Sequence, residues 1–241
     1  MLEVIAFDIA SCGIIARAGA NRIELCANPM EGGTTVSYGM LKAARAAVTI
    51  DIFPIIRPRG GDFLYTDEEY AIMEEDVKVC KQLGMDGVVI GGLLPDGTVN
   101  RDRIAKLVEI AYPLDVTFHR AFDRVRDPFE ALEAVINCGC TRILTSGLRD
   151  NAIAGAEMLA ALVKAADDRI IVMPGAGIRS GNIASLKETT NATEFHTSAR
   201  KLVASAMDFH QGGLSESTDA VTVDGEEIRK CLEALQSITA G

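Results

Sequence analysis

The chain has 241 residues, of which 48% are hydrophobic and 24% charged, as in an ordinary soluble globular protein. Its formal net charge of −10 disfavours broad nucleic-acid binding, and no apolar run is long enough to predict a membrane helix. Six cysteines without a paired CxxC spacing, and an amino-terminal segment without basic residues, are typical of a cytoplasmic protein with reduced thiols.

Short apolar runs alternate with helix-like segments along the whole chain. Between the runs, apolar residues recur every three and four positions, which is the period of an amphipathic helix. This alternation indicates parallel strands joined by crossovers, and eight such units favour a closed barrel. The sequence therefore predicts an α/β fold, a single (β/α)8 TIM barrel with eight parallel strands, as one domain over residues 1–241. The predicted strands are 2–7, 22–26, 51–57, 87–91, 115–119, 142–145, 170–174 and 194–197.

The last part of the chain departs from this rhythm. Residues 199–223 form a long stretch that contains Ser, Gly and Asp, so we expect an irregular loop over one mouth of the barrel or a partly disordered segment. Asp224 precedes Glu227 by three residues, which is typical of a helix start. The sequence therefore predicts a carboxyl-terminal helix over about residues 224–238.

Strand side chains alternate between two faces, which sorts them by position. In the fifth strand, Val116 and Phe118 should meet the surrounding helices, so His119 should face the barrel axis. Unpaired charges in a barrel interior cost several kcal/mol each, so inward ionisable groups must neutralise one another or a ligand. A buried ion-pair network and a ligand site are both open interpretations. The inward ionisable side chains are Glu3, Glu24, Arg57, His119, Glu194 and His196.

The segments that follow the strands are rich in basic residues and glycine. Arginine guanidinium groups suit carboxylate or phosphate, and glycines let backbone N–H groups approach an anion. Glu24 and His119 are the candidate catalytic acid and base, because imidazole titrates near neutral pH and burial can raise the pKa of a carboxyl towards it. The candidate anion-binding residues are Arg57, Arg59, Arg120, Gly175, Gly177, His196, Ser198 and Arg200.

Seven segments of the chain resemble the CutC family of copper-homeostasis proteins, in the right order over roughly residues 1–205. The resemblance implies a (β/α)8 barrel, a cytoplasmic location and a role linked to copper with Cu(I) binding, and it brings no established catalytic activity. The segments are RIELC (22–26), EGGTTVS (31–37), IRPRGGDFLY (56–65), VTFHRAFD (116–123), ILTSG (143–147), MPGAGI (173–178) and ATEFHTSAR (192–200).

The resemblance also directs attention to the cysteines, because Cu(I) prefers soft thiolate ligands. Cys26 matches the family's second-strand cysteine and faces inward by alternation. Ile5 stands where many relatives carry another cysteine, and Cys12 is the candidate that could replace it in space.

Two hypotheses follow from the sequence. The first is a cytosolic copper-handling protein with Cys26 as a metal ligand. The alternative is a barrel enzyme that acts on a small phosphorylated or carboxylated metabolite through Arg57, His119 and Arg120 with Glu24. The expected partner is therefore Cu(I) or a small anion, without nucleic acid or membrane, and a homo-oligomer stays open.

Overall fold

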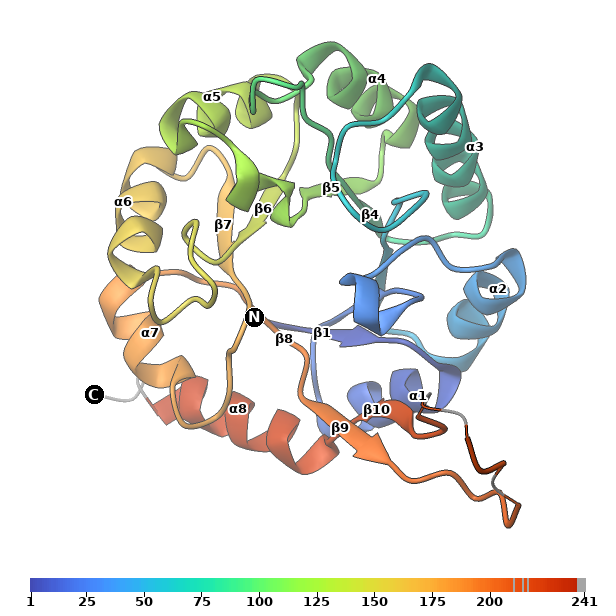
Figure 1. Ribbon diagram of the computed structural model, residues 1–241. Helices are drawn as coiled ribbons and strands as arrows, with labels where there is room; N and C mark the ends of the chain where they lie inside the picture. Colours follow the sequence, from blue (N-terminus) through green and yellow to red (C-terminus); the bar gives the residue numbers. More distant parts are fainter. Residues whose placement is uncertain (210, 214, 216, 238–241) are drawn as a thin grey trace.

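A computed structural model of the chain describes residues 1–209, 211–213, 215 and 217–237. Short strands lie around a central axis, and helices surround them as an outer layer (Figure 1). The strands are β1 (Leu2–Ala6), β2 (Arg22–Leu25), β3 (Asp51–Pro54), β4 (Gly87–Ile90), β5 (Asp115–Phe118), β6 (Arg142–Thr145), β7 (Ile171–Pro174) and β8 (Phe195–Thr197). Each lies at a position where the sequence predicts a strand.

The helices follow the strands in the expected alternation. They are α1 (Ile9–Ala18), α2 (Tyr38–Ala47), α3 (Asp67–Gln82), α4 (Arg101–Ala111), α5 (Pro128–Asn137), α6 (Ala156–Ala166), α7 (Ile183–Thr190) and α8 (Gly225–Ser237). Two short 3-10 helices, η1 (Pro29–Glu31) and η2 (Arg120–Arg124), follow β2 and β5. The predicted final helix is present, and the Asp224 carboxylate accepts hydrogen bonds from the backbone N–H groups of Glu226 and Glu227.

The predicted closed barrel is correct only in part. The strands form two parallel four-stranded sheets, β3-β2-β1-β8 and β4-β5-β6-β7. A parallel bridge between Ile55 and Val89 links the sheets on one side. In the described part of the chain no ladder joins β7 to β8, so the hydrogen-bonded ring is open there. With three residues, β8 is short, and its pairing is with β1.

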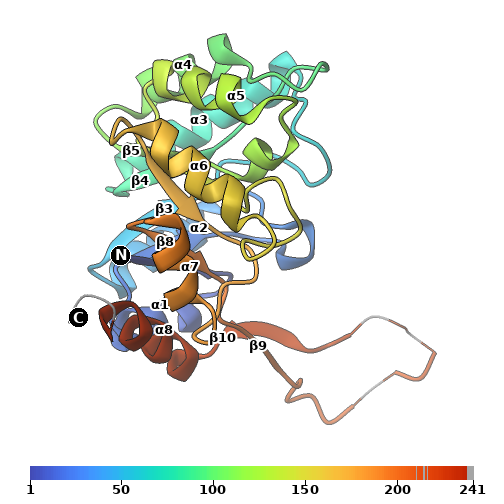
Figure 2. The ribbon, with the colours of Figure 1, turned by 90° about the vertical axis from the view of Figure 1, so that its left-hand side faces the viewer.

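The predicted irregular loop is partly wrong. Strands β9 (Arg200–Val203) and β10 (Ala220–Val223) pair antiparallel, and the described residues between them extend away from the barrel (Figure 2). Cross-strand pairing over such a distance gives no local sequence signal, and the two segments are short. Three residues of this stretch (210, 214 and 216) and the predicted helix end at 238 lie outside the described residues.

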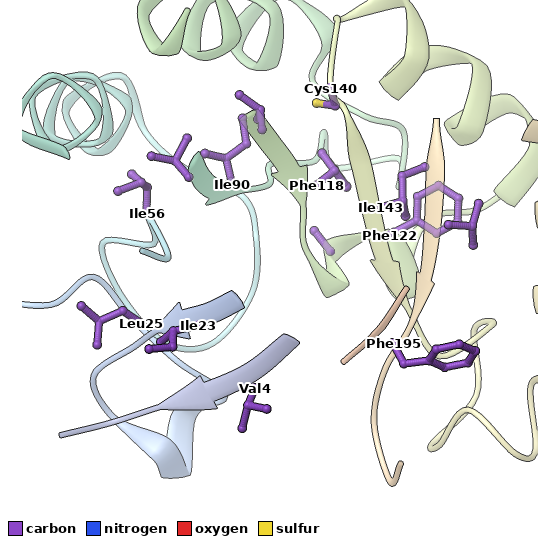
Figure 3. Packing of buried hydrophobic residues seen from close by; sticks show 14 of the residues in the cluster. Val4, Ile23, Leu25, Ile56, Ile90, Phe118, Phe122, Cys140, Ile143 and Phe195 are labelled. Carbon is purple, nitrogen blue, oxygen red and sulfur yellow. The ribbon is translucent and has the colours of Figure 1, made fainter. Parts of the chain in front are cut away.

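Alternation along the strands produces two apolar clusters. Outward side chains pack against the helices in a large outer core, which includes Val4, Ile23, Ile90, Phe118 and Phe195 (Figure 3). Inward side chains form a small inner cluster of Ile5, Cys26, Phe53, Ile55 and Val89. None of the described helices is long and apolar enough to cross a membrane.

Charged side chains form a second inner group, next to the aromatic ring of Phe53. Arg22 donates to Glu3 at 2.5 Å and to Glu194 at 2.6 Å, and Arg142 donates to Glu194 at 2.7 Å. Both guanidinium groups also lie over the Phe53 ring, at 4.8 and 5.5 Å from its centre. Glu3 and Glu194 are thus neutralised by other residues of the barrel, as the ion-pair interpretation predicts.

Candidate functional site

A cavity of about 240 Å³ opens among the segments that follow the strands, and we call it the inner cavity. It brings together most of the site residues predicted from the sequence: Glu24, Arg57, His119, Arg120, Gly177, His196, Ser198 and Arg200. They come from β2, β8 and the segments after β3, β5, β7 and β8. Its remaining lining is mainly apolar: Ile5, Phe7, Gly32, Ile55, Phe63, Leu144 and Ala176.

His119 directly follows β5, at the start of η2, and presents a neutral imidazole to this cavity. Its Nδ1 accepts a hydrogen bond from the Ala121 N–H at 3.1 Å, so the ring proton is on Nε2. Nε2 is buried and has no hydrogen-bond partner among the described residues. Burial, reinforced by the positive charge of Arg57, lowers the pKa of His119 to about 3. The side chain is therefore an uncharged hydrogen-bond donor at neutral pH.

Arg57 follows β3 and is 4% exposed. Nη1 donates to the carbonyl oxygens of Glu31 at 2.6 Å and Gly33 at 2.8 Å, and Nη2 donates to that of Gly61 at 2.8 Å. These bonds hold the guanidinium in place but bring no negative charge. Within the described residues no carboxylate lies within 4.0 Å of it, and its Nε has no partner. The cavity wall therefore carries a buried cation that an anion would neutralise.

Glu24 and His196 face each other in the same cavity. His196 Nδ1 lies 2.7 Å from Glu3 Oε1, and its Nε2 lies 3.8 Å from Glu24 Oε2. The strand register explains this arrangement, because Glu3 pairs with His196 across β1 and β8, and Ile5 pairs with Glu24 across β1 and β2. Glu3 thus orients the imidazole towards Glu24.

Burial and neighbouring charges shift the pKa values of Glu3, Glu24 and His196 in different directions. Burial raises the pKa of Glu24 to about 7, against the opposing charge of His196. Burial alone would raise the pKa of Glu3, but the hydrogen bond from His196 and the charge of Arg22 lower it to about 2. Burial would lower the pKa of His196, yet its bond to Glu3 and the charge of Glu24 raise it. Glu24 is therefore the carboxyl that can exchange a proton near neutral pH.

The cysteines do not assemble a thiolate pair. Cys26 belongs to the inner cluster, and burial followed by the charge of Glu24 raises the pKa of its thiol well above the usual value. Cys12 lies in α1 within the outer core, where its Sγ donates to the Asp8 carbonyl at 3.4 Å. The strands thus separate the two thiols, and Cys12 does not replace the cysteine expected at Ile5.

One other group of possible metal ligands stands out in the described part of the chain. Ligand atoms of Glu3, Glu24 and His196 lie within 4.8 Å of one another. Carboxylate and imidazole donors are harder than the thiolates that Cu(I) prefers. Glu3 also forms an ion pair with Arg22, so its negative charge is already neutralised without a metal.

Two predicted anion-binding residues do not line the inner cavity. Arg59 turns to its own loop, where it contacts Glu69 at 2.6 Å, Asp62 at 2.9 Å and the Leu64 carbonyl at 2.5 Å. Gly175 is buried, and a Cβ there would come within 2.4 Å of Leu144. Arg59 therefore shapes a loop, and Gly175 permits close packing.

Sequence reasoning missed several residues. Phe63 lies between the two basic groups, with its ring centre 4.9 Å from that of His119 and 5.0 Å from Arg57 Cζ. An aromatic residue in a loop gives no signal for such a position. Arg22 and Arg142 were also missed as inward charges, although Arg22 shares its alternation with Glu24 and could have been recognised.

Comparisons with known proteins agree on one family. The model of the CutC family matches residues 1–201. The family protein CutC of Chromobacterium violaceum is 48% identical over 98% of both chains. The human copper homeostasis protein cutC homolog is 44% identical over 89% of this chain and 79% of its own. The crystal structure of a copper homeostasis protein CutC from Streptococcus agalactiae superposes with a TM-score of 0.79, at 32% identity, over 82% of this chain and 97% of its own.

Proposed function

The chain belongs to the CutC family, and from that premise and the geometry of the inner cavity we propose that it binds a small molecule bearing a carboxylate or phosphate group and transfers a proton on that molecule. The observation that carries the proposal is Arg57, a buried guanidinium that lines the cavity without a carboxylate partner among the described residues. A bound anion would offset the cost of burying that charge.

The groups around the cavity suit proton transfer. Glu24 would act as the base, because its carboxyl is buried, lies in the cavity wall and is held opposite His196. His119 would donate its Nε2–H to an oxygen of the substrate, and its neutral state prevents it from simply pairing with the anionic group. A neutral imidazole facing a carboxylate base is a known arrangement for removing a proton from a carbon next to a carbonyl. Enolisation of a small oxo or hydroxy acid, or of its phosphate ester, is the reaction class that these groups support.

Deuterium exchange tests the proposal. The protein is incubated in D2O with a panel of 2-oxo acids, 2-hydroxy acids and sugar phosphates, and carbon-bound deuterium is measured by mass spectrometry. At least one compound should exchange, and Glu24→Gln should slow that exchange by about 10²–10⁴-fold. Glu109→Gln, on the exposed side of α4, is the control and should exchange at the original rate. A panel without any exchange would count against the chemistry.

Copper homeostasis, which the names of the mouse and human relatives state, is the second candidate function. The observation in its favour is Cys26, a cysteine in the inner cluster next to the cavity. A Cu(I) centre with two thiolates does not fit, because the other five cysteines of the chain belong to the outer core. A Cu(I) competition titration should therefore show no tight site that Cys26→Ser removes; tight one-site binding lost in that variant would favour the copper function instead.

A further inference from the structure

A second and larger hollow opens beside the inner cavity, and we call it the outer cleft. Its volume is about 1000 Å³, and it shares Gly32, Arg57, Phe63 and Arg120 with the inner cavity. The segments after β2, β3, β4, β5 and β6 form it. The two hollows therefore adjoin at these residues, and Phe63 forms part of the wall of both.

The outer cleft differs from the inner cavity in chemistry. Its charges are balanced, because acidic residues such as Glu31, Asp62 and Asp150 accompany Arg124 and Arg149 in the lining. It therefore has no excess positive charge to attract a second anionic group. Its apolar lining comes from Leu64, Leu93, Leu94, Pro95 and Leu148.

Two of these leucines are partly exposed to solvent. Leu64 is 39% exposed and Leu94 is 41% exposed, and they come from loops that follow different strands. Apolar side chains gathered in a concave site commonly mark a place for the apolar part of a ligand.

Hydrogen bonds hold the walls of the outer cleft in place. The Asp123 carboxylate accepts from Thr145 Oγ1 at 2.5 Å, from the Ser146 N–H at 3.0 Å and from the Leu148 N–H at 3.2 Å, which ties the segments after β5 and β6 together. Arg120 adds bonds to Asp123 at 2.6 Å and to Ser146 Oγ at 3.0 Å. On the other side, Arg59 holds the Leu64 carbonyl. The cleft is therefore formed before a ligand arrives.

We infer that the inner cavity and the outer cleft are two halves of one binding site, and that the substrate carries an uncharged apolar tail, which lies in the outer cleft, on its anionic head. This inference rests on the proposed function for the identity of the head. The inner cavity, at about 240 Å³, is smaller than the roughly 300–1,000 Å³ of usual ligand pockets, so the head must be small. The tail supplies the remaining contact area and selects among molecules with the same head.

Two series of simple anions test the inference. Methyl and hexyl phosphate form one pair and acetate and heptanoate the other, and their dissociation constants are measured by calorimetry with the full chain. The longer member of at least one pair should bind ten times more tightly or better, because burial of methylene groups is favourable. The pair that shows the gain identifies the head as phosphate or carboxylate.

Variants of the two leucines test whether the apolar tail binds in the outer cleft. Leu64→Ser and Leu94→Ser should each reduce the gain to threefold or less and leave the short member's affinity unchanged. Leu202→Ser, an exposed leucine on β9 that lines neither hollow, is the matched control and should keep the full gain.

The outcomes separate this inference from the proposed function. Equal binding of short and long members, or a gain that survives both leucine variants, would overturn the two-part site while leaving anion binding intact. If no member of either series binds, the proposed function itself fails. A gain lost in the cleft variants and kept in Leu202→Ser supports both.

Discussion

Arg57 and Arg59 are two positions apart and have the same side chain, yet they have different roles. Arg57 is held by carbonyl oxygens and faces the inner cavity, whereas Arg59 is paired with Asp62 and Glu69 in its own loop. The sequence predicts that both bind an anion, because the residue type alone identifies a guanidinium group. Loop conformation decides which one reaches the cavity, and strand alternation gives no information beyond the end of a strand.

The protonation of Glu24 gives a prediction about pH. The folded protein keeps this proton up to about pH 7, whereas the unfolded chain releases it near the ordinary carboxyl pKa of 4.5. The folded state thus binds more protons in this range, so its stability falls as the pH rises from 4.5 to 7. Glu24→Gln removes this loss, so relative to the original protein its free energy of unfolding should rise by about 3 kcal/mol across the range.

Urea unfolding at pH 5 and pH 8 measures this difference. Glu109→Gln, the same substitution at an exposed position of α4, serves as the control. If Glu24→Gln and the original protein changed in parallel between the two pH values, the buried carboxyl would not be the group described here.

At the scale of elements, charged side chains connect strands that are distant in sequence. Arg22 on β2 reaches Glu194 just before β8, and Arg142 on β6 reaches the same carboxylate. The Arg22–Glu194 pair lies within the β3-β2-β1-β8 side, whereas the Arg142–Glu194 pair links that sheet to the other, for which no β7–β8 ladder is found in the described residues. The Arg142–Glu194 ion pair therefore links the two sheets at a place where no backbone hydrogen bonds between strands are found in the described residues.

This arrangement predicts a large cost for removing Glu194. Glu194→Gln leaves Arg142 buried with its main counter-charge gone, which should lower the free energy of unfolding by about 3–5 kcal/mol. Glu133→Gln is the matched control, because Glu133 pairs with Arg169 on the surface and solvent screens that pair. Chemical denaturation of both variants at pH 7 measures the difference. Equal stability of the two variants would contradict a supporting role for the buried pairs.

The sequence predicted the contents of single strands but not the contacts between distant elements. Alternation in β2 and β5 correctly places Glu24 and His119 inward and Ile23 and Phe118 outward, because a strand allows only two faces. The β9–β10 pairing and the gap beside β8 were not predicted, since both depend on contacts between distant segments. The same limit applies to Cys12, whose helix carries it to the outer core.

At the scale of the whole molecule, the described residues divide the barrel interior by chemistry. One inner group is a set of mutually neutralised charges, a second is the apolar inner cluster, and the third is the inner cavity, whose wall carries the buried guanidinium of Arg57. The sequence predicted several of the ionisable residues that face the axis, but it missed Arg22 and Arg142 and did not indicate how the inward residues divide among these groups. The one-domain organisation, the cytoplasmic location and a homo-oligomeric state stay predictions.

The account depends most on the binding of an anion at Arg57. The most direct test is the thermal unfolding midpoint, measured in chloride-matched buffer with increasing inorganic phosphate and, separately, increasing acetate. At ten times the dissociation constant, binding should add about 1.4 kcal/mol and raise the midpoint by about 3–6 °C. Arg57→Gln should abolish the rise, and Arg59→Gln should keep it. A flat midpoint with both anions, or an unchanged rise in Arg57→Gln, would contradict the account.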